Sequence, residues 1–244
     1  MQRWVSGLIV ALGVALSGPA LAFTTPFGEA VNAAIERGLE FYRGEQNGNG
    51  SFGPTREATA LVVLCFLEKR ASADWNAPPV GYAGMSQADQ TRVRNAIRWL
   101  IENDGGLQGR TPNSYTTGSA LMALSVYLDT GGPADVGAAI TARQAVDNGV
   151  GGLRNTQGNR GANQGGWSYP TPENDGDLST TQFAMAGLSA AEVIVPGASG
   201  TLSRAVAFVD NTRDNDGGHV YRGGRTDRYD SSSSMTASGL WTYR

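Results

Sequence analysis

Residues 46–67 read QNGNGSFGPTREATALVVLCFL, and this stretch decides the fold class of the chain. The Asn- and Gly-rich segment from Gln46 to Gly53 has turn chemistry that ends a helix. Pro54-Thr55-Arg56-Glu57 then starts a new helix, where Thr is a favourable capping residue. Residues 58–67 are apolar on nearly all sides, which is typical of a buried helix.

A helix of a different kind precedes this turn. Within residues 29–43, apolar residues recur near the i, i+3, i+4 spacing of an amphipathic helix, and Glu36 and Arg43 belong to its polar side. The same order of amphipathic helix, Gly-rich turn and apolar helix recurs over residues 94–128, 138–191 and 202–243. The apolar helices start near Glu57, Thr116, Ser179 and Ser232, so the unit exceeds the ~33 to 34 residues of tetratricopeptide and ankyrin repeats.

Neither helix of such a unit can bury its apolar face alone, whereas stacked units can. We therefore predict an all-α fold, without strands, of four outer/inner helix pairs whose apolar helices form an inner layer. The turns from outer to inner helices gather at one end of this stack. They take up much of the high glycine content, 34 residues in all, and in the third unit the turn includes Gly149 to Gly152.

The repeats resemble the terpenoid cyclase and protein prenyltransferase superfamily. Triterpene cyclases of the squalene-hopene type carry a QW signature, in which a basic and a small residue precede an aromatic one and then Q-x-x-x-G-x-W. Degenerate copies of this signature are Arg37-Gly38, Phe41, Gln46, Gly50 and Phe52; Arg204-Ala205, Phe208, Arg213, Gly217 and His219; Asn95-Ala96 with Trp99; and Gln164-Gly-Gly-Trp167. The resemblance implies a partial α/α toroid around a central cavity, and the motif's role in it is structural.

The first 22 residues are typical of an export signal. Arg3 precedes the apolar run from Leu8 to Leu16, and Ala20-Leu21-Ala22 is an A-x-A cleavage site. The run is shorter than the ~20 residues that span a membrane, and Gly18-Pro19 breaks it. We expect residues 1–22 to be a signal peptide and residues 23–244 to be an exported repeat domain, periplasmic or extracellular. Because the family closes its ring with more repeats, the chain is alternatively a fragment.

Composition excludes several classes of function. The formal net charge is −3 and the basic residues do not cluster, which disfavours a nucleic-acid partner. One Cys, Cys65, and one His, His219, exclude an internal disulfide and a Cys/His zinc cluster. We interpret Cys65 as a small buried hydrophobe and His219 as part of a turn. Asp214 to Gly217 and Glu173 to Asp177 carry oxygen ligands but read better as solvated turns than as calcium loops. No metal or cofactor is expected.

Catalytic residues are the hardest to find. Cyclases of the resembled family that protonate an alkene use a D-x-D-D motif at the start of an inner helix, and no such motif is present. Asp177 and Asp230 are the remaining candidate acids, although a single Asp before Ser or Thr is more often a helix cap. The four serines from Ser231 to Ser234 are likewise explained by capping.

The first functional hypothesis is therefore a non-catalytic binding or structural module of the superfamily, with a hydrophobic small molecule or a peptide as ligand. One alternative is a squalene-cyclase-like enzyme, an isomerase or lyase, whose acid lies outside this sequence. A further alternative is an exported polysaccharide-processing enzyme. Self-association is also open, because a repeat array exposes apolar ends.

Overall fold

The computed structural model describes residues 24–161, 164–169, 176–223 and 230–243. This part of the chain is helical and holds only isolated β-bridges, which confirms the all-α prediction. The helices are α1 (Pro26–Gly44), α2 (Arg56–Glu68), α3 (Gly81–Gly84), α4 (Gln87–Asn103), α5 (Ser114–Asp129), α6 (Ala142–Thr156), α7 (Leu178–Ala191), the 3-10 helix η1 (Ala198–Thr201), α8 (Leu202–Asn211) and α9 (Ser233–Thr242).

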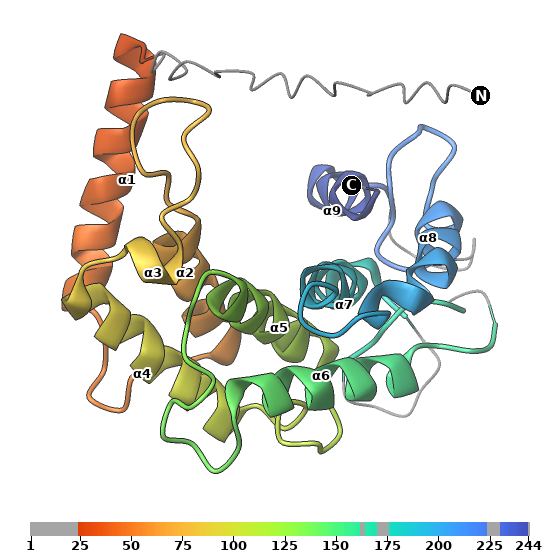
Figure 1. Cartoon of the computed structure of the whole chain (residues 1–244). Coiled ribbons are helices and arrows are strands. Elements are labelled where there is room, and N and C mark those ends of the chain that lie inside the picture. Colours follow the sequence, from red (N-terminus) through yellow and green to blue (C-terminus); the bar gives the residue numbers. More distant parts are fainter. Residues whose placement is uncertain (1–23, 162–163, 170–175, 224–229, 244) are drawn as a thin grey trace, which may run out of the picture.

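The long helices form two curved rows (Figure 1). The inner row consists of α2, α5, α7 and α9, and each of these helices packs on the next one in this order. The outer row consists of α1, α4, α6 and α8, which lie on the convex side. The most extensive contact between two helices joins α5 and α7, so the core sits where the middle helices of the inner row meet.

Each helix of the inner row begins with a side-chain cap. Thr55, Asn113, Asp177 and Ser232 accept hydrogen bonds from backbone N–H groups of the first turn of α2, α5, α7 and α9. These bonds satisfy donors that a helix start leaves unpaired. The capping roles predicted for Thr55 and Asp177 are confirmed, and α9 is capped by Ser232, one of the four serines, and not by Asp230.

A threonine lies at the fourth residue of all four helices in the inner row, at positions 59, 117, 181 and 236. Three of these hydroxyls accept the backbone N–H of a buried residue from the preceding loop: Phe52 to Thr59 at 3.0 Å, Trp167 to Thr181 at 2.9 Å and His219 to Thr236 at 3.0 Å. The loops are thus fixed to the helices that follow them by the same bond.

Glycines let two of these loops press against the next outer helix. Gly50 and Gly165 have φ angles of 98° and 96°, in the left-handed region that favours glycine. A Cβ atom on Gly50 would meet the carbonyl oxygen of Asn95 in α4 at 2.6 Å, and one on Gly165 would meet that of Arg204 in α8 at 2.1 Å. Any side chain at either position would therefore separate the loop from the outer row.

Two predictions for the third unit are wrong. Gly149, Gly151 and Gly152 lie inside α6 and not in a turn, and this helix starts at Ala142, whereas the unit was expected to open with a helix from residue 138. A Cβ on Gly149 would meet Leu121 at 2.9 Å, so this glycine allows α6 to lie close to α5. The glutamine of the QW-like signature in this unit is Gln157 and not Gln164. Gln157 is buried and donates to Gly165 O at 2.8 Å, as Gln46 donates to Gly50 O at 3.0 Å in the first unit. Gln164 is exposed.

The expected signal peptide, residues 1–22, lies outside the described residues. Among the helices that the structure describes, none combines the length and the apolar character that a membrane crossing requires.

Candidate functional site

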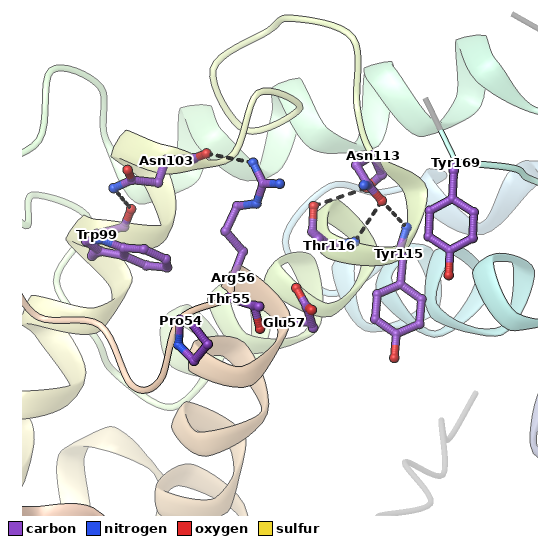
Figure 2. A pocket seen from close by; sticks show the side chains of 10 residues that line it. All are labelled: Pro54, Thr55, Arg56, Glu57, Trp99, Asn103, Asn113, Tyr115, Thr116 and Tyr169. Carbon is purple, nitrogen blue, oxygen red and sulfur yellow. Dashed lines mark hydrogen bonds between the residues drawn. The ribbon is translucent and has the colours of Figure 1, made fainter. Parts of the chain in front are cut away.

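A cavity of about 600 Å³ opens where the starts of α2 and α5 meet the end of α4 (Figure 2). Its wall runs from Trp99 and Asn103 on α4, across the start of α2, to Tyr115 on α5 and Tyr169 in the loop before α7. Ligand sites of this volume are common in proteins. The remaining lining residues are Pro54, Thr55, Arg56, Glu57, Asn113 and Thr116.

Two charged side chains stand side by side at the start of α2. Arg56 reaches across to α4, and its Nη1 donates to the carbonyl oxygen of Asn103 at 3.1 Å, which is one of the carbonyls that a helix end leaves unpaired (Figure 2). Glu57 is half-buried between this arginine and α5. The cavity therefore offers a cation, a carboxylate and several amide and hydroxyl groups.

Aromatic rings form the other half of the wall. The rings of Tyr115 and Tyr169 are stacked with centroids 6.3 Å apart and planes inclined by 21°. The ring of Tyr115 also packs on that of Phe183 in α7, with centroids 4.3 Å apart. The ring of Phe183 in turn packs on that of Trp241 in α9, with centroids 5.8 Å apart. Burial, followed by the neighbouring Tyr169 and Glu57, raises the pKa of Tyr115, so its hydroxyl stays protonated at neutral pH. A row of rings thus runs along the inner helices from the cavity.

A buried carboxylate binds Thr116, one of the residues that line the cavity. Asp104 follows α4 and is 1% exposed, and it accepts hydrogen bonds from the hydroxyls of Thr116 and Thr117 at 2.7 Å each. It also accepts the backbone N–H of Leu107 at 3.2 Å. These bonds fix the start of α5 to the end of α4. Local sequence patterns do not indicate this role of Asp104, because its threonine partners follow a further loop.

The two candidate acids lie in different surroundings, and neither lines this cavity. Asp177 is 1% exposed and caps α7 by accepting the backbone N–H of Thr180 at 2.8 Å. Burial raises the pKa of its carboxyl, while hydrogen bonds from Thr180 and Tyr221 oppose this shift. Asp230 is exposed in the segment before α9. The interpretation of Asp177 as a cap is confirmed, and the same interpretation is wrong for Asp230.

The interpretation of Cys65 as a buried residue is wrong, and His219 lies next to a turn, as expected, but is buried. Cys65 is exposed and lines a groove between α1 and α2, and partial burial raises the pKa of its thiol. His219 is 3% exposed, because its loop folds under α9 and its ring lies against the backbone of Gly239. Its Nδ1 pairs with the hydroxyl of Thr212 at 2.9 Å, and burial lowers its pKa. His219 is a core residue.

The acidic turns hold their own backbone. Asp216 accepts the backbone N–H of Gly218 at 2.8 Å and the hydroxyl of Ser231, and Asp214 accepts the N–H of Asn215 at 2.7 Å. The second acidic segment, from Glu173, lies largely outside the described residues. In the part of the chain that the structure describes, no three His, Cys, Asp or Glu side chains gather as a metal site.

No protein-family model matches the chain, and the comparison with curated proteins gave no match. The resemblance to the toroid superfamily therefore rests on the residues quoted for it.

Proposed function

We propose that the chain is a partial α/α toroid of the terpenoid cyclase and prenyltransferase type that acts outside the cytoplasm as a non-catalytic module and binds a peptide. The observation that carries this proposal is the cavity in Figure 2, which combines aromatic rings with charged and amide groups. A peptide presents both kinds of partner, because its backbone needs hydrogen bonds and its side chains pack on rings. A purely hydrophobic small molecule would offer no hydrogen bond to the charged groups of Arg56 and Glu57 that line the cavity.

The two-row packing and the threonine at the same position of each inner helix support the repeat architecture of the proposal. The residues that would mark an enzyme of the family do not line the cavity, since its one carboxylate is Glu57. A binding site without an acid–base pair fits a role in recognition.

The test is selection from a peptide library, followed by titration calorimetry of the selected peptides. The Tyr169→Ala variant removes an exposed ring of the cavity, and Glu57→Gln removes its carboxylate. Both should weaken binding by about 10-fold, the size of one lost contact of about 1.4 kcal/mol. Tyr243→Ala is the matched control, because Tyr243 is a similarly exposed tyrosine on the far end of the chain. Equal loss in all three variants contradicts the proposal.

One observation favours a second candidate, a cyclase-like enzyme. Asp177 is a buried carboxyl with a raised pKa at the start of an inner helix, as expected of an acid that protonates an alkene. Incubation of the protein with squalene and with a polyprenyl diphosphate separates the two. Turnover that disappears in Asp177→Asn establishes the enzyme. Release of reducing sugar from candidate polysaccharides establishes instead an enzyme that processes sugars.

Export is proposed on the sequence of residues 1–22. The exported protein should start at Phe23, which an intact-mass measurement of protein recovered outside the cytoplasm determines.

A further inference from the structure

The start of the inner row carries an uncovered apolar face among the described residues. A groove of about 320 Å³ between α1 and α2 is lined by Phe41, Leu61 and Cys65, together with other mostly apolar residues. Phe41 is 62% exposed, Leu61 is 39% exposed and Cys65 is exposed. Apolar side chains of this size at the end of a helical stack mark a contact surface.

The other end of the inner row has a similar face. On α9, Leu240 is 63% exposed and Trp241 is 43% exposed, and Ala237 on the preceding turn is exposed as well. The two faces belong to opposite ends of one row (Figure 1).

The register between neighbouring inner helices shows how such faces fit together. Gly118 lies five residues after the cap Asn113, and Gly187 lies ten residues after the cap Asp177. A Cβ on Gly187 would meet the Cα of Gly118 at 2.9 Å, so the fifth position of one helix lies against the tenth of the next. The corresponding residues of α7 and α9, Gln182 and Thr242, line one cavity together.

The same register assigns partners to the two uncovered faces. The tenth position of α2, counted from the cap Thr55, is Cys65, and the fifth position of α9, counted from Ser232, is Ala237. Both are exposed. Leu240 corresponds to Leu121 of α5, which is completely buried, and Leu61 corresponds to Phe183 of α7, whose backbone lies 2.3 Å from a Cβ built on Gly118. Each end thus presents residues at positions that a neighbouring helix covers in the middle of the structure: Leu121 lies against Gly149 of α6 in the outer row, and Phe183 lies against Gly118 of α5 in the inner row.

We infer that the α9 end of one copy binds the α2 end of a second copy of this chain, and that the contact continues the packing of the inner row. This interface is heterologous, because it joins two different surfaces, and successive copies form a ring or an open filament. It rests on the observed helix register and is independent of the proposed peptide ligand.

Disulfide cross-linking tests the predicted neighbours directly. In Ala237→Cys, the new thiol should lie within disulfide distance of Cys65 of another copy. Mild oxidation should give reducible dimers and longer species, and mass spectrometry should find the peptide that links residues 65 and 237. Ser203→Cys is the matched control, because Ser203 is an exposed residue of α8 in the outer row. A yield of cross-links no higher than in this control overturns the inference.

Complementation by mixing tests the polarity of the contact. Leu61→Glu retains an intact α9 end, and Leu240→Glu retains an intact α2 end. Each variant alone should sediment as a monomer, and their mixture should form dimers but no longer species. Circular dichroism checks that both variants fold. The head-to-tail contact is contradicted if the wild-type chain stays monomeric both with and without residues 1–22. It is also contradicted if the Leu240→Glu variant still self-associates. Wild-type association that neither substitution weakens contradicts it as well, since another surface then carries the association.

Discussion

The hydroxyl of Thr117 donates to Asp104 Oδ1 at 2.7 Å, and both residues are completely or almost completely buried. Thr117 belongs to the first turn of α5, and Asp104 directly follows α4. The pair therefore joins an inner helix to its outer neighbour behind the candidate ligand cavity.

Replacement of this hydroxyl should destabilise the protein. Thr117→Val keeps the shape of the side chain but removes a hydrogen bond to a buried carboxylate, so the free energy of unfolding should fall by about 1.5 to 3 kcal/mol. Urea denaturation measures the change. Thr91→Val is the control, because Thr91 is exposed and should change stability by no more than about 0.5 kcal/mol. Equal effects of the two substitutions argue against a special role of the Asp104 bond.

Two glycines in helices should respond to alanine with opposite signs. A Cβ on Gly118 would lie 2.3 Å from the carbonyl oxygen of Phe183, so Gly118→Ala should lower the free energy of unfolding by about 1 to 3 kcal/mol. Gly151 in α6 has no atom within 4 Å of a built Cβ, so Gly151→Ala should raise stability by about 0.5 to 1 kcal/mol. Thermal unfolding of both variants is the measurement. A stabilising Gly118→Ala contradicts the close packing of α5 on α7.

Asp177 should make stability fall as pH rises. Its pKa is raised by burial above the ~3.9 of an unfolded aspartate, so the folded state holds this proton more tightly. The contribution is complete below about pH 4 and is lost as pH rises through the pKa of the folded state. Asp177→Asn keeps a capping side chain and does not titrate. Its stability relative to wild type should rise between about pH 3 and pH 7, and a flat difference contradicts the shift.

Asp89 should have the opposite dependence. Burial acts to raise the pKa of Asp89, but the hydrogen bonds and the charge of Arg43 outweigh it and hold the pKa below its usual value. Arg43 Nε and Nη2 donate to this carboxylate at 3.1 Å and 3.0 Å and join α1 to α4. The stabilisation is present above about pH 4 and is lost as pH falls through the pKa of the folded state.

Asp89→Asn tests this dependence. The variant should lose stability relative to wild type at neutral pH, and the difference should shrink in acid. Urea midpoints at several pH values give the comparison, and a difference that does not depend on pH argues against the charge of Asp89 as the cause.

Local sequence patterns were sufficient for the helices of the inner row and their starts, but not for α6. The apolar periodicity around Ala58 to Leu67 and the capping side chains of Thr55 and Asp177 act within a few residues, so their effect can be read without knowledge of the rest of the chain. The candidate cavity follows only in part from them. The sequence placed the starts of the inner helices at one end, but it did not indicate that Tyr169 stacks on Tyr115 or that Asp104 holds both threonines, because these partners come from separate loops.

What the sequence by itself determined is therefore an all-α chain of alternating amphipathic and apolar helices with polar caps. What only the tertiary structure decided is which small or ambiguous residues are buried. Gly149 suits either a turn or a helix, and its contact with Leu121 decides for the helix. Cys65 is exposed although it was expected to be buried, and His219 is buried beside its turn. Burial depends on whether a neighbouring helix covers a residue, and that neighbour is set by packing across the fold.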